Sequence, residues 1–139
     1  PLLRYRTKDI TSLDYSPCKC GRTTVRMANL QGRTDDMLKI RGVNVFPSQI
    51  EEIVLGVEEI GPHYEIVVTR QDHADKLEIK VELVKSTDNF NEITAIERKI
   101  KNKLRVVLGL DAKITLVSPN TLQRFEGKAK RVKDLRDNI

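Results

Sequence analysis

The sequence predicts an α+β protein, a ferredoxin-like β-α-β-β-α-β sandwich with helices packed on one face of a sheet. Residues 77–83 alternate apolar and polar side chains without interruption, as a strand with one solvent-exposed face requires. Residues 90–108 carry apolar side chains three and four positions apart, which is typical of a helix with one apolar face. Such a strand and such a helix bury their apolar faces best against each other.

The first 34 residues are irregular, because turn-forming residues such as Ser16-Pro17, Gly21 and Gly32 interrupt short apolar pieces. We expect a short β-rich segment there that belongs to the edge of another domain. The sandwich is expected to begin at residue 35, with extended segments at 37–40 and 43–46 on either side of Gly42.

The first helix is predicted over residues 47–55. Pro47 suits a first helical position, and Ser48 with Glu51 has the spacing of a capping box. Strands follow at 64–69 and 77–83, and the short polar stretch 71–76 between them predicts an antiparallel hairpin.

The second helix is predicted over residues 90–108 and ends at Gly109, a helix-terminating glycine. Its predicted apolar stripe is the set Phe90, Ile93, Ile96, Ile100, Leu104, Val107 and Leu108. A last strand is expected at 113–117. Residues 118–139 form a strongly basic tail with little apolar periodicity.

The composition is that of a folded domain, with 39% hydrophobic residues among 139. The net charge of +5 arises from 25 basic and 20 acidic residues, so a phosphate-bearing partner is permitted but not required. No apolar run approaches the roughly 20 residues that span a bilayer, and we expect a cytoplasmic protein without membrane contact. Because the chain opens with Pro1-Leu2-Leu3-Arg4 and no Met, we expect it to be part of a longer polypeptide.

Two charged segments are not explained by the predicted fold. The first, Gly32–Gly42 (GRTDDMLKIRG), places charges before and inside a short strand and ends on a glycine, where the backbone can bend or approach a ligand closely. Charges on an edge strand also prevent aggregation, which is the alternative explanation.

The second segment is Arg124–Arg131 (RFEGKAKR). Gly127 frees the backbone to deliver the cationic side chain of Lys128 into a cavity, where a point charge would suit phosphoryl chemistry. The alternative is a solvated basic tail or a general anion contact.

Together, in this order and with a sandwich between them, the two segments resemble the acyl-adenylate-forming superfamily. Residues 42–51 (GVNVFPSQIE) and 61–64 (GPHY) are similar to phenylacetate–CoA ligases, and the resemblance covers essentially the whole chain. It implies a ligase that activates an aryl acetate, phenylacetate, with ATP to an acyl-adenylate and then transfers the acyl group to CoA. It also implies that residues 1–34 end a large amino-terminal adenylating domain and that 35–139 form a small mobile carboxy-terminal domain.

The resemblance also assigns the nucleotide and hinge residues. Tyr5–Asp9 (YRTKD) is similar to the motif whose terminal aspartate accepts hydrogen bonds from the ribose hydroxyls of ATP, a role that falls to Asp9. Arg33 matches the arginine that contacts the nucleotide. Asp35 matches the hinge between the two domains, and Asp36 is the adjacent candidate.

The catalytic and CoA-facing residues follow in the same way. Lys128 matches the lysine that bridges the substrate carboxylate and the α-phosphate during adenylation, with Lys130 and Arg131 as basic neighbours. Gly42 matches the glycine beside the pantetheine tunnel, and Lys39 and Arg41 are expected contacts for CoA or AMP. Gln123 departs from the proline that relatives usually carry before the arginine.

The family mechanism uses the two segments in turn. Lys128 would offset the negative charge that gathers during adenylation, and rotation about Asp35 would then withdraw it and present the strand Lys39–Gly42 to CoA. The large domain, most of which lies outside this chain, would make most of the contacts to Mg²⁺ and ATP and would supply the acyl pocket. The chain alone is therefore expected to be inactive.

Cys18 and Cys20, one residue apart, are poorly placed for a stabilising disulfide. They are either two free thiols in a turn or two thiolate ligands of a zinc ion. In the second case the missing domain would supply the other zinc ligands. His63, at a strand start, and His73, in a polar loop, are expected to be structural or solvated.

Two functions without catalysis compete with the ligase. A basic sandwich of this topology can bind RNA, but that requires aromatic residues on the central strands, and residues 77–83 have none. A regulatory small-molecule sensor that dimerises would leave both charged segments without a purpose. We therefore expect small-molecule substrates and the large domain as partners and no nucleic acid, with a homodimer left open.

Overall fold

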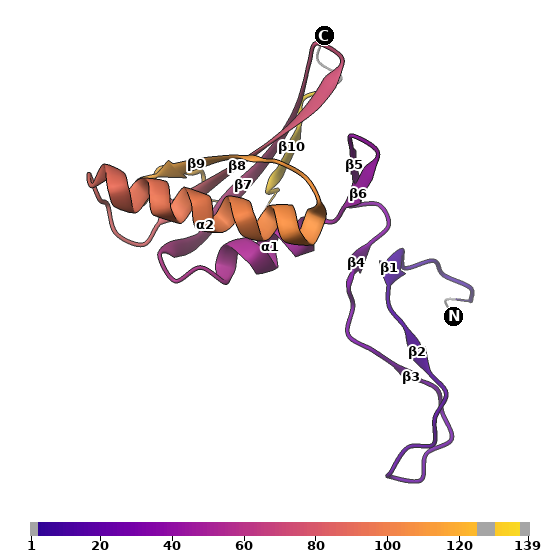
Figure 1. The fold of residues 1–139 in the computed structure, drawn as a ribbon. Coiled ribbons are helices and arrows are strands. Elements are labelled where there is room, and N and C mark those ends of the chain that lie inside the picture. The colour runs from indigo at the N-terminus through magenta and orange to yellow at the C-terminus, as the bar shows by residue number, and fades with distance from the viewer. Residues whose placement is uncertain (1–2, 125–129, 137–139) are drawn as a thin grey trace. The chain divides into compact units, whose positions relative to one another are not determined.

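The computed structural model describes residues 3–124 and 130–136 (Figure 1). The chain divides into two compact units: unit 1 is Pro1–Met37 and unit 2 is Leu38–Ile139. The division falls close to the boundary expected before residue 35.

Unit 1 consists of short paired strands. β1 (Asp9–Ile10) pairs antiparallel with β4 (Gly32–Arg33), and β2 (Leu13–Asp14) pairs antiparallel with β3 (Arg26–Met27). None of its described residues is buried. Unit 1 is thus the expected β-rich segment, and its described part has no core.

The centre of unit 2 is a four-stranded sheet in the order β10-β7-β8-β9. β7 (Ile60–Gln71) and β8 (Ala74–Leu83) form the predicted antiparallel hairpin. β9 (Lys113–Val117) lies parallel to β8, and β10 (Val132–Asp134) lies parallel to β7.

The hairpin is longer than predicted, because its turn contains only two residues. Asp72 and His73 both adopt positive φ, 50° and 63°, as a tight turn between twisted strands requires. The strands therefore continue through most of the stretch 71–76, which was expected to be a polar loop. Asp and His tolerate the left-handed region better than most residues, although without the ease of glycine.

The edge of the sheet next to β7 differs from the prediction. The expected first strand is instead β5 (Leu38–Ile40), which pairs with β6 (Val43–Val45) in a separate two-stranded sheet. β10, from the tail that was expected to be merely basic, takes the free edge of β7. Val132 packs against the core and β7 gains a hydrogen-bonding partner along its edge, which explains why the tail returns to the sheet.

Both predicted helices are present. α1 spans Pro47–Leu55 and α2 spans Phe90–Leu108, where Gly109 ends it at φ 66°. The predicted capping box of α1 is wrong: the Gln49 side-chain oxygen accepts from the Phe46 N–H at 3.1 Å. Because Pro47 is the first helical residue, Phe46 is the capping position, and Ser48 already lies inside the first turn.

The core lies between the two helices and the sheet (Figure 1). Its most deeply buried side chains, which are essentially inaccessible to solvent, come from both helices and from the β7–β8 hairpin. They are Ile50 and Val54 of α1, Ile100 and Leu104 of α2, and Ile66, Val68, Ile79 and Val81 of the hairpin. Burial of one such side chain contributes about 1.5–3 kcal/mol. The ends of the predicted stripe are exposed, since Phe90 is 77% and Val107 54% accessible. Among the described residues, neither helix has the length and hydrophobicity that a membrane-spanning segment needs.

Candidate functional site

Pairing of β1 with β4 brings two of the predicted nucleotide residues together. Asp9 lies opposite Arg33 in the ladder, and the Arg33 Nη1 is 3.7 Å from the Asp9 Oδ1. A carboxylate and a guanidinium thus share one edge of unit 1, and both side chains are partly exposed.

Asp35, the predicted hinge residue, is held by the same arginine. Nε and Nη2 of Arg33 donate to the two carboxylate oxygens of Asp35, each at 3.0 Å, and the Lys8 ammonium lies 3.5 Å away. The hydrogen bonds from Arg33 hold the pKa of Asp35 at about 2. Asp36 is only at the margin of this cluster, with its Oδ2 3.9 Å from the Arg33 Nε.

The predicted glycine Gly42 lies in the turn of the β5–β6 hairpin. Arg41 and Gly42 form a two-residue turn with φ of 48° and 81°. A Cβ atom at position 42 would meet nothing within 4 Å, so the positive φ and not a close contact favours glycine here.

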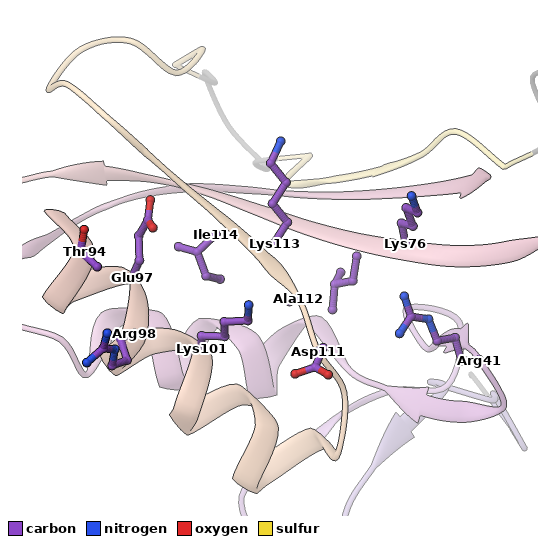
Figure 2. A pocket seen from close by; sticks show the side chains of 11 residues that line it. Arg41, Lys76, Thr94, Glu97, Arg98, Lys101, Asp111, Ala112, Lys113 and Ile114 are labelled. Carbon is purple, nitrogen blue, oxygen red and sulfur yellow. The ribbon is translucent and has the colours of Figure 1, made fainter. Parts of the chain in front are cut away.

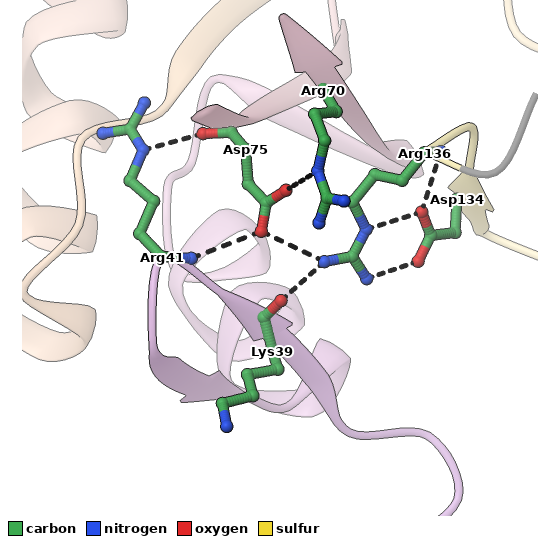
Figure 3. A network of polar contacts seen from close by, with 6 residues as sticks. All are labelled: Lys39, Arg41, Arg70, Asp75, Asp134 and Arg136. Atoms are coloured by element: carbon green, nitrogen blue, oxygen red, sulfur yellow. Dashed lines mark hydrogen bonds and ion pairs between the residues drawn. The ribbon is translucent and has the colours of Figure 1, made fainter. Parts of the chain in front are cut away.

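The two predicted cations of this hairpin behave differently. The Arg41 Nε donates to the Asp75 carbonyl oxygen at 2.7 Å, and the Arg41 N–H approaches the Asp75 Oδ2 at 3.5 Å. Lys39 is exposed and its ammonium has no partner within residues 3–124 and 130–136, while its side chain points away from this network (Figure 3).

Asp75 is the centre of a polar network that was not predicted from the sequence (Figure 3). It accepts from the Arg70 Nε at 3.0 Å and from the Arg136 Nη1 at 3.2 Å. Burial disfavours its charged form, but the hydrogen bonds from Arg70 and Arg41 outweigh burial and hold the pKa of Asp75 below its usual range. No sequence motif marks this residue, because its partner Arg136 is 61 residues away in the chain.

Lys128 lies in 125–129, outside the described residues, but the segment before it is firmly attached. Nη1 and Nη2 of Arg124 donate to the two carboxylate oxygens of Glu82 at 3.1 and 2.9 Å. The backbone N–H groups of Leu122 and Asn120 donate to the same carboxylate at 2.6 and 3.3 Å. Glu82 is 3% accessible; burial opposes its ionisation, yet these donors, Arg124 first, lower its pKa.

The segment after 125–129 is attached to other elements. The Arg131 guanidinium stacks over the Tyr64 ring at 4.5 Å from the ring centroid and forms an ion pair with Glu51 of α1. The Arg131 carbonyl accepts from the Ile66 N–H at 2.8 Å, where β10 begins. Lys130, the other predicted neighbour, is exposed.

A groove of about 680 Å³ runs between α2, the start of β8 and β9 (Figure 2). Five cationic side chains line it against two acidic ones: Arg41, Lys76, Arg98, Lys101 and Lys113 against Glu97 and Asp111. The excess of positive charge suits a phosphate-bearing ligand.

Cys18 and Cys20 are free thiols with their sulfur atoms 2.9 Å apart. The contact with Cys18 lowers the pKa of Cys20, which favours its thiolate. Within the described part of the chain, no cluster of three or more potential metal ligands exists. Of the two histidines, His63 lies half-buried within β7 and His73 lies in the β7–β8 turn.

Residues 42–136 match the family model described as "AMP-binding enzyme C-terminal domain". The chain is 45% identical to a phenylacetate-coenzyme A ligase of Thermus thermophilus, over 98% of the chain and 34% of that relative. It is 41% identical to the Escherichia coli phenylacetate-coenzyme A ligase, over 100% of the chain and 32% of the relative. The chain thus spans about a third of the length of these relatives.

Solved structures give the same match. A domain of a phenylacetate-coenzyme A ligase from Bacteroides vulgatus is 35% identical with a TM-score of 0.68, over 76% of the chain and 97% of that domain. A 2-hydroxyisobutyryl-CoA ligase in the postadenylation state with 2-HIB-AMP is 34% identical with a TM-score of 0.78, over 92% of the chain and 28% of that protein. The same ligase with 2-HIB-AMP and CoA, in the thioesterification state, has a TM-score of 0.69 over 94% of the chain and 28% of that protein.

The Asp35 carboxyl should titrate near pH 2 in the folded chain, below its ordinary value of 3.8. Since the folded-state pKa is depressed, this ion pair stabilises the fold above the ordinary value, and its contribution disappears as the pH falls towards 2. NMR titration of the Asp35 carboxyl carbon measures this, with Arg33→Gln expected to return the midpoint to the ordinary range. An unchanged midpoint in that variant would contradict the assigned cause.

Glu82→Gln should destabilise the fold by about 2 kcal/mol, because an amide cannot accept all four hydrogen bonds and places an NH₂ group against other donors. Urea unfolding of the chain measures this loss. Glu59→Gln is the matched control: it removes the exposed Glu59–Lys99 ion pair and should have little effect. Equal losses of unfolding free energy in the two variants would contradict the claim that the buried hydrogen bonds of Glu82 stabilise the fold.

Proposed function

Because the chain belongs to the family of AMP-binding enzyme C-terminal domains, we propose that it is the carboxy-terminal part of an AMP-forming acyl-CoA ligase. The complete ligase would activate phenylacetate, or a related aryl acetate, with ATP and transfer the acyl group to CoA. The observation that carries this proposal is the 45% identity to a phenylacetate-coenzyme A ligase over 98% of the chain.

In this proposal unit 1 ends the large adenylating domain and unit 2 is the small mobile domain. Asp35 and Asp36 supply the hinge near the division between the units. The exposed Arg33–Asp35 pair supports this role, since an ion pair in water contributes little stability and can be broken by a modest change elsewhere.

The first half-reaction would use the cluster in unit 1 together with Lys128. A carboxylate oxygen of the substrate attacks the α-phosphorus of ATP, the bond to the bridging oxygen breaks, and pyrophosphate leaves. Asp9 would accept hydrogen bonds from the ribose hydroxyls, Arg33 would contact the nucleotide, and Lys128 would offset the charge gathering between two anions. Mg²⁺, held mainly by the rest of the polypeptide, would neutralise phosphate charge.

The second half-reaction would use the β5–β6 hairpin. The CoA thiol loses its proton to solvent, its sulfur attacks the acyl carbonyl carbon, the bond to the AMP oxygen breaks, and AMP leaves as the thioester forms. Gly42 would lie beside the pantetheine tunnel, and the exposed Lys39 would contact CoA or AMP. Arg41 lines the cationic groove of Figure 2, which supports phosphate binding on this side of unit 2.

Three further features belong to the same proposal. Cys18 and Cys20 would supply two of four zinc ligands if the rest of the polypeptide supplies the others. The ligase would act in the cytoplasm on small molecules, and a homodimer is compatible with it. A nucleic-acid-binding module is not favoured, because β8 has no aromatic residue to stack on a base, and the Tyr64 ring of β7 is buried.

Lys128→Ala in the intact ligase should abolish acyl-adenylate formation and spare thioester formation from supplied acyl-adenylate. The lysine charge is needed only while the carboxylate and the α-phosphate approach each other. Pyrophosphate release and CoA-thioester formation, measured separately, give the two rates. Lys130→Ala is the matched control and should retain both, and an equal loss of both steps in Lys128→Ala would contradict the role.

Asp35→Pro should have the reverse effect, with adenylation retained and thioester formation lost. Proline restricts φ to about −65° and so limits rotation at this position. Asp35→Ala removes the carboxylate without this restriction and should keep both steps. If the alanine variant loses thioester formation as completely as the proline variant, the position does not act as a hinge.

A further inference from the structure

The β5–β6 hairpin has few interactions of its own that fix its turn. Each strand contains three residues, and a two-stranded hairpin of this size is marginal in water. Ile40 and Val45 are buried in the core and fix the strands. The turn itself projects beyond them, and Arg41 adopts a φ of 48° that L-residues rarely favour. Contacts from outside the hairpin therefore add to the few interactions within it that fix the turn.

Asp75 and Arg136 provide these contacts (Figure 3). The Arg136 Nη1 donates both to the Lys39 carbonyl oxygen at 2.6 Å and to the Asp75 Oδ2 at 3.2 Å. Asp75 in turn accepts the Arg41 N–H through this carboxylate oxygen and the Arg41 Nε through its carbonyl oxygen. The first residue of the turn and the strand that leads into it are thus bound to one ion pair.

The ion pair is itself fixed by neighbouring strands. Nε and Nη2 of Arg136 donate to the two carboxylate oxygens of Asp134 on β10, at 2.9 and 2.6 Å. Asp75 is bound by Arg70, its partner residue in the β7–β8 ladder. Because the side chains of Asp75 and Arg136 are only 12% and 16% accessible, solvent and salt screen their attraction less than that of a surface pair.

We propose that Asp75 and Arg136 are positioning residues for thioester formation, which act by holding the Arg41–Gly42 turn in the orientation that CoA requires. This inference rests on the proposed function, since it assigns the hairpin to the second half-reaction. The side-chain anchors on either side of residues 125–129 are Glu82, Tyr64 and Glu51, and none of these three belongs to the Asp75 network. The two sets of contacts meet at β10, whose backbone pairing with β7 does not depend on Arg136. Loosening that network should therefore affect one half-reaction and not the other.

The test uses the intact ligase with Asp75→Asn and, separately, Arg136→Gln. Thioester formation from bound acyl-adenylate should slow by about tenfold or more, because small misplacements of reacting groups have large effects on rate. Adenylation, followed by pyrophosphate release, should stay within about twofold of the unmodified ligase. Hydrogen exchange at the amides of residues 39–43 should accelerate while the amides of β7 and β8 stay protected.

Glu59→Gln serves as the control, because it removes an exposed ion pair with Lys99 that is not part of the network. If Asp75→Asn does not fold, Arg136→Lys replaces it: lysine keeps the charge but cannot bind Asp134 through two nitrogens while reaching Lys39, so the same selective loss is expected. Equal losses in both half-reactions, or no loss in thioester formation, would overturn the inference. An unmodified ligase that forms no acyl-adenylate from any aryl acetate would instead refute the proposed function.

Discussion

The antiparallel pairing of β7 and β8 is the interaction on which the proposed functional segments of unit 2 depend. The core helices pack on this hairpin, β10 pairs with its free edge, and its side chains bind both charged segments. Asp75, near the start of β8, binds the turn of β5–β6, and Glu82, near its end, binds Arg124 just before residues 125–129. These two carboxylates are separated by seven residues of one strand, which corresponds to roughly 23 Å. The two segments are thus anchored at opposite ends of a single rigid strand.

The ion pairs of the two units differ in a way that fits their proposed roles. Glu82 and Asp75 are shielded from solvent and accept several hydrogen bonds each, so they keep their partners fixed. Asp35 also has a paired carboxylate, but both it and Arg33 are exposed, and its pairing can be exchanged for water. Burial therefore separates contacts that hold a segment in place from contacts that a rotating hinge could release.

The periodicity of apolar residues predicted the helices and strands that bury a full face. It did not predict shorter elements. The helix over 90–108 and the alternating strand over 77–83 are long enough to show their periods, and both are present. β10 has three residues in a basic tail, and the Asp72-His73 turn has no glycine, so neither gave a usable signal. Sequence similarity pointed to Asp9, Arg33 and Asp35, and the fold brings these three together. It could not reveal the Asp75–Arg136 pair, because that contact exists only once β10 has docked on β7.

The central claim is that one small unit presents two different segments to the same reaction by rotating about Asp35. It is tested most directly by the distance between spin labels at Tyr15 in unit 1 and Val106 in unit 2 of the intact ligase, both of which are exposed. The spin labels are attached to ketone-bearing amino acids introduced at these two positions, so that the free thiols of Cys18 and Cys20 stay unlabelled. The account predicts one distance distribution with bound acyl-adenylate and a different one after a non-reactive CoA analogue is added. A single distribution in both states would contradict it.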